Sequence, residues 1–585
     1  MMLESGLLQE GAERYELTGP LPPLAIPATL HDSLMARLDR LAMVKGLAQL
    51  GATLGREFSY ELLRAVSPWD EVTVQRGLHQ LVEAEFLYQR GVPPQATYLF
   101  KHALIQDTAY QSLLRSTRQQ FHQRIVQVLE AQFPEICETQ PELLAHHYTE
   151  AGVIAHAIPY WQKAGQRAIQ RSAHAEAIAH FSKGLDLLKI LPDSPARARQ
   201  ELGFQVALGP ALMVAKGWGA PEVEPVYARA RALSQQVEES PELFPILWGL
   251  WRFYFVRTEY QTARALAEQC LSLAQRVHDT ALLLLAHQVL GATAYYLGEV
   301  TLGRVYLEQG LALYAPQEHR PLAFRYGLDL GVWCLSYLAW PLWMLGYPDQ
   351  ALQRSREALT LAQELSHPVS LAAALFYIAI THHLRRDSDA VQECAEAAIA
   401  LAREQGFALY LAVGTAMRGW AVSVQGHAEE GMTQLRQGMA ALQAMGVKLD
   451  SPRFLGMLAE AHASMGQAEE GLRILAEALR VADNTGEHYY TAELCRLKGA
   501  LLLAQSSAQG EEAAACFRQA LDIARQQQAK SLELRAATSL SWLWQRQGRR
   551  VEARELLAPV YDWFTEGFDT ADLQEAKTLL EELGG

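Results

Sequence analysis

The stretch VWCLSYLAWPLWMLGYPDQALQRSREAL, residues 332–359, places small residues at fixed distances from a central glycine. Gly346 interrupts two helical patterns, and Ala339 lies seven residues before it. Ala351 and Ala358 follow it by five and twelve residues. Two antiparallel helices approach closely only where their side chains are short, and glycine suits the tight turn between them. The stretch therefore predicts a helix hairpin.

The same pattern recurs along the second half of the chain. Similar hexapeptides, GEVTLG, GYPDQA, GHAEEG, GQAEEG and GRRVEA, begin at residues 298, 346, 426, 466 and 548. Arg386 stands 40 residues after Gly346, where another glycine would fit, and Thr258 anchors an earlier, weaker copy. One further copy, with a two-residue insertion, fits between 466 and 548. A single hairpin cannot bury its apolar face alone, so the repeats predict a mainly α fold, a solenoid of stacked hairpins.

This spacing resembles the tetratricopeptide repeat over roughly residues 140–570. That family has small residues at its eighth, twentieth and twenty-seventh positions and glycine near its fifteenth. The repeats here measure 40 residues instead of about 34 and lack the closing proline of the family, so longer helices are expected. The resemblance implies a right-handed superhelix with a concave, partner-binding surface.

In that family, the second, fifth, ninth and twelfth positions of the first helix line the concave surface. The corresponding residues here are mostly aromatic: Trp248, Phe255, Tyr295, Trp333, Trp340, Trp343, Phe376, His383 and Trp420. Such a surface can grip a protein, a peptide or a small ligand. In an alternative interpretation, a tightly wound superhelix fills its own interior with these rings. Pro341 predicts a kink or a local opening in the helix that carries three of the tryptophans.

The N-terminal part of the chain combines helical and β patterns. A helical pattern covers 33–52, and Asp70 is a candidate N-cap for a helix that runs to Glu83. The β-prone runs at 85–89 and 97–100 flank the turn-rich GVPPQA and predict a hairpin. Helices followed by a hairpin predict a small winged-helix-like α+β domain.

Three strings in this part, IPATLHDSLMARLDRL, AQLGATLGREFSYELL and YLFKHALIQDTAYQSLL, begin at residues 26, 48 and 98. Together they resemble the segment after the ATPase core in bacterial signal-transduction ATPases with numerous domains (STAND). Many of those proteins carry a class III adenylate or guanylate cyclase domain first. The resemblance implies that ATPase and cyclase parts lie upstream of Met1, which is then an internal start or the edge of a truncated gene. This chain would keep the adaptor and the sensor.

We therefore expect five segments. Residues 1–28 would be a remnant of the ATPase lid or a linker, and 29–130 the winged-helix-like adaptor. Residues 131–240 would form the first, irregular helical repeats, 241–570 the tetratricopeptide-like superhelix, and 571–585 a C-terminal capping helix.

No catalytic motif is found in the sequence. It contains no G-x-x-x-x-G-K-[ST] phosphate loop, no G-x-S-x-G and no H-E-x-x-H. The pairs His146–His147 and His382–His383 are poor chelates, because adjacent residues point to different faces of a helix. The six cysteines are scattered without a C-x-x-C pair, which argues against a disulfide framework or zinc site and favours a reducing cytoplasm. We expect no enzyme activity, no cofactor and no bound metal.

Charge and length argue against two further partners. The net charge of −14 does not suit a chain-wide surface for nucleic acid or anionic membrane. Arg115, Arg118 and Arg124 lie in one basic run and are the candidate nucleic-acid contacts, although a solvated helix face explains them as well. The apolar run 332–347 is shorter than the ~20 residues of a membrane span.

The sequence thus predicts a cytoplasmic, non-catalytic sensor or protein-interaction arm of a signal-transduction ATPase, which binds a partner or ligand in the groove of its repeats. An alternative is a DNA-binding transcriptional regulator that acts through the winged-helix-like segment. A third interpretation assigns ATPase or adenylate cyclase activity by homology to longer relatives, and ATP turnover by the purified chain would favour it.

Overall fold

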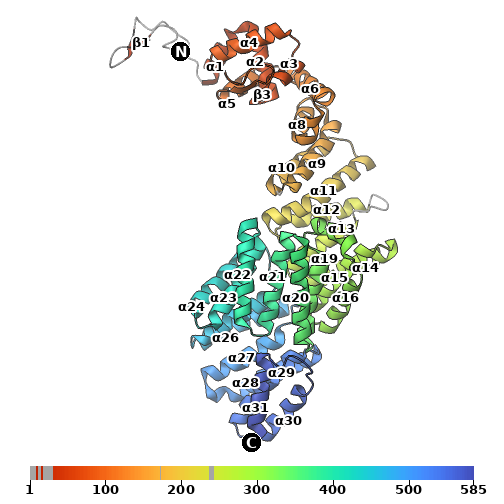
Figure 1. Ribbon diagram of the computed structural model, residues 1–585, viewed down its shortest axis with the longest axis vertical. Helices are drawn as coiled ribbons and strands as arrows, with labels where there is room; N and C mark the ends of the chain where they lie inside the picture. Colours follow the sequence, from red (N-terminus) through yellow and green to blue (C-terminus); the bar gives the residue numbers. More distant parts are fainter. Residues whose placement is uncertain (1–7, 11–14, 18–29, 172, 236–242, 585) are drawn as a thin grey trace. The chain divides into compact units, whose positions relative to one another are not determined.

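The computed structural model describes residues 8–10, 15–17, 30–171, 173–235 and 243–584 (Figure 1). The predicted lid remnant, residues 1–28, lies mostly outside these ranges. Within it, β1 (Leu8–Glu10) and β2 (Tyr15–Leu17) pair as an antiparallel hairpin. The chain divides into two units, residues 1–191 and 192–585. The five segments expected from the sequence stay a prediction.

The first unit contains an α+β domain followed by helices. Its further elements are α1 (Leu30–Asp39), α2 (Ala42–Leu54), β3 (Glu57–Ser59), α3 (Tyr60–Val66), α4 (Glu71–Glu83), β4 (Leu87–Arg90), β5 (Thr97–Phe100), α5 (Ala103–Gln111), α6 (Arg115–Gln132), α7 (Pro134–Thr139), α8 (Pro141–Glu150), α9 (Ile154–Gln170) and α10 (His174–Leu188). The strands form one antiparallel sheet in the order β3-β5-β4. Phe58, Tyr98 and Phe100 are buried side chains of this sheet, so the strands close one side of the domain core.

Two local predictions for this domain are confirmed. Asp70 caps α4, because its Oδ1 accepts a hydrogen bond of 2.9 Å from the Thr73 amide. The hairpin β4–β5 forms, but β4 begins only at Leu87, because Glu85 adopts a left-handed φ of 63° that extended chain does not have. The strand β3 was missed, since three residues carry too short a pattern to read. The name winged helix stays a prediction.

Replacing Asp70 by alanine is expected to lower the urea midpoint for unfolding of the α+β domain, because alanine cannot cap the first turn of α4. The change removes the acceptor of both the Thr73 amide and the Thr73 hydroxyl, each at 2.9 Å. Urea denaturation followed by circular dichroism measures the effect. In the control Asp107→Ala, an exposed carboxylate within α5 is lost, and the urea midpoint should stay close to that of the wild type. Equal effects of the two changes would contradict the capping role.

The second unit is a solenoid of antiparallel helix pairs (Figure 1). The pairs are α11 (Pro195–Lys216) with α12 (Val223–Ser234), α13 (Leu243–Val256) with α14 (Tyr260–Val277), α15 (Thr280–Tyr296) with α16 (Val300–Ala312), α19 (Leu330–Met344) with α20 (Pro348–Leu365), α21 (Pro368–Leu384) with α22 (Ser388–Gln405), α23 (Ala408–Val424) with α24 (Ala428–Ala444), α25 (Ser451–Ser464) with α26 (Ala468–Thr485), α27 (Thr491–Gln505) with α28 (Gly510–Gln526), and α29 (Lys530–Arg546) with α30 (Arg550–Tyr561). Short helices α17 (Pro316–His319), η1 (Arg320–Leu322) and α18 (Ala323–Tyr326) precede α19, η2 (Ser507–Gln509) precedes α28, and α31 (Ala571–Gly584) follows α30. The mainly α, tetratricopeptide-like solenoid expected from the sequence is confirmed.

The predicted repeat breaks are the turns between paired helices. Backbone φ is positive at every anchor: Thr258, Gly298, Gly346, Arg386, Gly426, Gly466 and Gly548. Thr258 and Arg386 adopt φ values of 64° and 63°, so the geometry of the turn persists where glycine is replaced. The further copy expected between 466 and 548 is the pair α27–α28, whose turn is the short helix η2.

Small residues mark the crossings of paired helices, as expected. A Cβ atom added to Gly419 would lie 2.7 Å from the carbonyl oxygen of Gly431 on the paired helix. Gly291 and Gly303 face each other in the same way, with 3.1 Å between an added Cβ on either residue and the carbonyl oxygen of the other. Backbone therefore packs on backbone at these points, which only short side chains permit.

Two loops from later repeats reach the inner helices of earlier ones. In the loop before α25, the Lys448 amide donates a hydrogen bond of 2.8 Å to the carbonyl oxygen of Val256. In the loop before α27, the His488 amide donates to the carbonyl oxygen of Tyr296 at 2.9 Å. The superhelix is therefore wound tightly enough for its own loops to enter its interior.

The apolar run quoted first forms α19, in which every side chain is buried. The helix continues through Pro341 to Met344, and the Leu345 amide donates to the Pro341 carbonyl at 2.9 Å. Within this helix no local opening is seen, and the kink stays a prediction. Across the described ranges, no helix combines the length and apolarity needed to cross a membrane.

Candidate functional site

The aromatic residues expected in the groove lie on the first helices of the pairs and are buried. Each has an exposed fraction below one-tenth: Trp248, Phe255, Tyr295, Trp333, Trp340, Trp343, Phe376, His383 and Trp420. Many of the rings pack on one another. Tyr295 lies 5.7 Å from Trp340 and 4.8 Å from Tyr489 of the loop before α27, between ring centroids. Such contacts are what the self-filling interpretation predicts.

A buried polar centre lies among these rings. The Asp450 carboxylate accepts hydrogen bonds from Arg453 at 2.9 Å, Tyr489 at 2.5 Å and Tyr296 at 3.2 Å. Nearby, the Tyr260 hydroxyl donates to Glu487 at 2.9 Å. Burial, with the Asp450 charge beside it, raises the pKa of Glu487 well above its usual range. The adjoining cavity has a volume of only ≈ 50 Å³, so this part of the inner face is core.

Further along the inner face, a pocket of ≈ 300 Å³ remains open. It is lined from α21, α23, α25, α27, α29 and α31, and we call it the inner-face pocket. Two of the predicted groove residues, His383 and Trp420, line it, and their rings lie 4.5 Å apart. The Nδ1 atom of His383 is buried, and no described residue forms a hydrogen bond with it. The pocket therefore includes two of the groove positions, and their binding role stays a prediction.

A network of ion pairs forms one wall of the inner-face pocket. Arg496 binds Glu493 through two hydrogen bonds, of 2.9 and 2.8 Å. Arg535 lies over the ring of Trp343 at 4.9 Å and donates to Asp572 at 2.9 Å. Burial alone would raise the pKa of Glu493, but the charges of Arg496 and Arg535 outweigh it and lower the pKa to about 2. These arginines are therefore already neutralised by the protein.

Glu460 is a carboxylate of the same pocket that lies outside this network of ion pairs. Its Oε2 atom accepts one long hydrogen bond, 3.4 Å, from the indole nitrogen of Trp420. Among the described residues no cation forms an ion pair with it. Burial raises the pKa of Glu460 and the neighbouring Glu493 charge adds to the effect, while the charges of Arg496 and Arg535 partly oppose it. A carboxylate in this position favours the approach of a positive charge.

The charged residues that line the inner-face pocket were not among the predicted site residues, although the repeat pattern marks their positions. Counted from Gly466, Glu460 occupies the same ninth position of a first helix as Trp340 and Trp420 do in their copies. Arg535 occupies the second position counted from Gly548. The aromatic residues alone do not reveal these charges, but the same register carried into the last copies would have found them.

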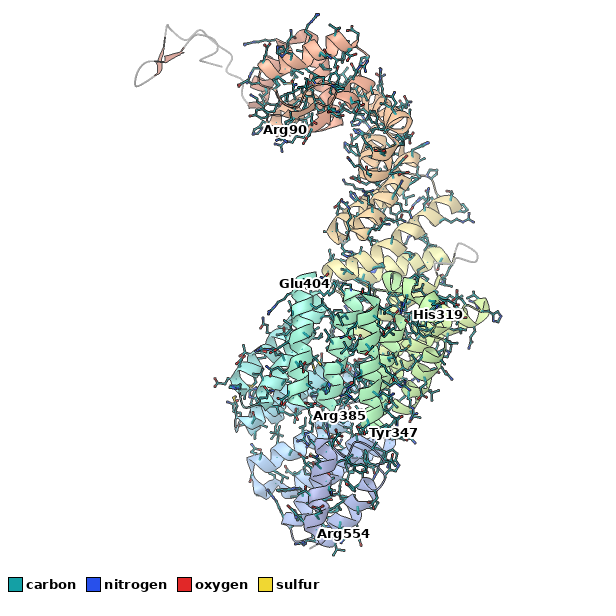
Figure 2. All side chains as sticks on the ribbon, viewed as in Figure 1. Arg90, His319, Tyr347, Arg385, Glu404 and Arg554 are labelled. Atoms are coloured by element: carbon teal, nitrogen blue, oxygen red, sulfur yellow. The ribbon has the colours of Figure 1, made fainter. Side chains whose placement is uncertain are left out.

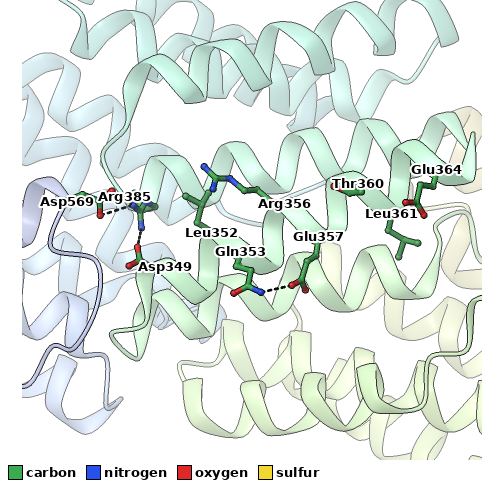
Figure 3. Close-up of a pocket in the computed structure, with 10 residues that line it drawn as sticks. All are labelled: Asp349, Leu352, Gln353, Arg356, Glu357, Thr360, Leu361, Glu364, Arg385 and Asp569. Carbon is green, nitrogen blue, oxygen red and sulfur yellow. Dashed lines mark hydrogen bonds and ion pairs between the residues drawn. The ribbon is translucent and has the colours of Figure 1, made fainter.

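A second hollow lies on the outer surface along α20, with a volume of ≈ 630 Å³ (Figure 3). Three of its charged groups bind one another, since Arg385, labelled also in Figure 2, contacts Asp349 at 3.3 Å and Asp569 at 3.2 Å. Gln353 donates to Glu357 at 2.9 Å. Because Arg385 already binds Asp349 and Asp569, and none of the lining residues holds a groove position of the repeats, we consider this hollow the weaker candidate.

The candidate nucleic-acid contacts lie on α6 in the first unit. Arg118 stacks over the ring of Tyr110 at 5.1 Å and donates to the carbonyl oxygen of Leu113 at 3.1 Å. Arg124 donates to the carbonyl oxygen of Ser67 at 3.1 Å. Arg115 is exposed at the start of the helix. Two of the three arginines thus bind the protein itself, which fits a structural role.

No family model matches the chain. An uncharacterised protein of Rhizobium meliloti (strain 1021) is 27% identical over 520 residues, which cover 88% of this chain and 50% of that protein. The chain therefore spans about half the length of the curated relative it matches.

Solved structures with related architecture share little sequence with the chain. A Rap protein complexed with competence and sporulation factor is 13% identical, with 69% of this chain and 99% of that chain covered and a TM-score of 0.44. The APC/C hetero-tetramer Cut9–Hcn1 is 10% identical, with 80% and 90% covered and a TM-score of 0.43. A STAND protein with a tetratricopeptide repeat sensor from Pyrococcus horikoshii is 12% identical, with 95% and 68% covered and a TM-score of 0.29. Likenesses at this level do not indicate a shared function.

Proposed function

We propose that this chain is a non-catalytic sensor arm of a signal-transduction protein, and that its repeat unit binds a positively charged group in the inner-face pocket. The observation that carries the proposal is Glu460, a partly buried carboxylate that forms no ion pair with the described residues and accepts only one long hydrogen bond. The rings of Trp420 and Tyr490 line the same pocket. Aromatic faces attract cations, so these rings and the carboxylate favour the same ligand charge.

The size and charge of the pocket limit the occupant. A volume of ≈ 300 Å³ is at the lower end of the range of small-molecule sites, which suits a protonated amine, a quaternary ammonium or a guanidinium group. The group can belong to a free small molecule or to a side chain of a partner peptide. An anionic ligand would have to displace Glu493 or Asp572 from the arginines that they already bind.

The sensor role rests on the N-terminal resemblance to signal-transduction ATPases. We propose that the α+β domain is the winged-helix-like coupler, and that an ATPase or cyclase domain of a longer protein receives the signal. A cytoplasmic location accompanies this proposal, because all six cysteines are unpaired. A role in DNA binding is less well supported, since Arg118 and Arg124 bind the protein itself.

Positively charged compounds are expected to stabilise the chain through Glu460. Thermal unfolding with a panel of polyamines, choline, arginine amide and lysine-rich peptides should show a raised Tm for at least one of them. Glu460→Gln keeps the shape of the side chain and removes its charge, so it should abolish that rise. At a ligand concentration 100 times Kd, the stabilisation would be about 2.7 kcal/mol.

The control for this experiment is Glu469→Gln, an equal loss of charge at an exposed position at the start of α26. It should leave the rise in Tm unchanged. Stabilisation by acetate or phosphate instead of amines, or an unchanged response of the Glu460→Gln variant, would overturn the proposal.

A further inference from the structure

Three histidines meet between two helices of the first unit. His122 lies on α6, and His146 and His147 are adjacent on α8. One ring nitrogen from each can be chosen so that all three lie within 4.8 Å of one another. The Nδ1 atoms of His122 and His147 are 2.7 Å apart. We refer to these residues as the histidine cluster.

A third histidine, His122, makes metal binding possible where the adjacent pair alone could not chelate an ion. Neighbouring residues on a helix differ by about 100° in direction, so His146 and His147 cannot chelate an ion alone. His122 enters from the other helix and lies against both, with ring centroids 5.6 Å from His146 and 5.0 Å from His147. Nitrogen atoms from two helices therefore converge on one point.

His122 has the outer contact that metal-binding histidines usually show. The Nε2 atom of His122 is 3.0 Å from the Tyr110 hydroxyl, which itself donates to Glu150 at 3.3 Å. This series of hydrogen bonds fixes the orientation of the His122 ring and leaves Nδ1 as its ligand atom. The Nε2 atom of His147 is buried and has no hydrogen-bond partner among the described residues, so this ring lacks the outer contact that His122 has.

We propose that the histidine cluster binds a divalent transition metal of the zinc class. Imidazole nitrogen is a preferred ligand of Zn²⁺, Co²⁺, Ni²⁺ and Cu²⁺. Tetrahedral coordination at ~2.1 Å places ligand nitrogens about 3.4 Å apart. The distance between the Nδ1 atoms of His122 and His147 therefore has to increase by less than about 1 Å when the ion enters. His146 is exposed, so its ring is free to turn, and water completes the coordination from the solvent side.

The metal would join α6 to α8 and so tie the end of the α+β domain to the helices that follow it. This role is independent of the inner-face pocket, which belongs to the other unit. Binding to the folded state alone raises the stability of that state in proportion to the logarithm of free metal concentration.

Metal titration of the full-length, tag-free chain after treatment with a chelator tests the proposal. Calorimetry with Zn²⁺ should show one tight site, and Co²⁺ should give the visible absorption of a tetrahedral site with nitrogen ligands. His146→Ala removes an exposed ligand without disturbing the core and should weaken Zn²⁺ binding by about 100-fold or more. Tyr110→Phe removes only the outer contact and should cost about 10-fold.

The control His79→Ala removes an exposed histidine of α4 and should leave the tight site unchanged. Circular dichroism of each variant confirms that it folds. Absence of a tight site in the wild-type chain, or the same affinity in the His146→Ala variant, would show that the cluster is structural only.

Discussion

Replacing Asp450 by alanine is expected to lower the free energy of unfolding of the repeat unit by about 3–5 kcal/mol. Asp450 is 5% exposed and Arg453 is 1% exposed, so the change leaves a guanidinium charge in the interior without its carboxylate. The hydroxyl groups of Tyr296 and Tyr489 lose an acceptor at the same time. A buried charge without a partner costs much more than a lost surface contact.

A double replacement separates the missing charge from the missing packing. In the variant Asp450→Ala/Arg453→Met, both charges are absent and the methionine keeps apolar volume, so part of the stability should return. Urea denaturation of the wild type, both single variants and the double variant gives the coupling energy. A loss below about 1 kcal/mol for Asp450→Ala, or no recovery in the double variant, would mean that the polar centre is solvated.

The repeat architecture could be predicted because its physical requirements appear directly in the residue types. Close crossings need short side chains, and Gly419 facing Gly431 is one result. The turns need a positive φ, which glycine provides at most anchors. Thr258 and Arg386 could still be placed at turns, because the spacing around them was kept when the glycine was not.

The filled interior could not be predicted from the repeat pattern. It depends on loops before α25 and α27 that reach helices much earlier in the chain. The hydrogen bonds from Lys448 to Val256 and from His488 to Tyr296 join backbone atoms, so the residue types do not reveal them. The side chains that hold the same loops, such as Asp450 and Glu487, do not show in the sequence which distant tyrosines they bind. The sequence alone therefore does not decide whether the groove rings face a ligand or one another.

The two candidate binding sites could each be recognised only in part. His383 and Trp420 are aromatic groove positions in the repeat register, but Glu460 in the next copy has the same register and a different chemistry. In the histidine cluster, the adjacent pair is visible in the sequence but cannot chelate by itself. His122 comes from another helix, and the packing of two helices is not visible in one sequence.

Replacing Trp340 by alanine is expected to cost about 3–5 kcal/mol of stability, because its ring is 2% exposed and packs against Tyr295 and Tyr337. The indole nitrogen also loses its bond of 3.4 Å to the Tyr377 carbonyl. Thermal and urea unfolding measure the loss. A groove residue that waits for a ligand would behave differently, with binding reduced and stability nearly kept.

The chain offers a matched control at the same place in another repeat. Trp542 occupies the ninth position counted from Gly548, as Trp340 does from Gly346, but it is 46% exposed and lies beside Arg546. Trp542→Ala should change stability by about 1 kcal/mol or less. If the two variants lose similar stability, the position in the repeat alone determines the cost of the change. The description of the early repeats as having a closed interior would then be wrong. A large difference shows that the early repeats use their inner tryptophans as core, which leaves ligand binding to the pocket beyond them.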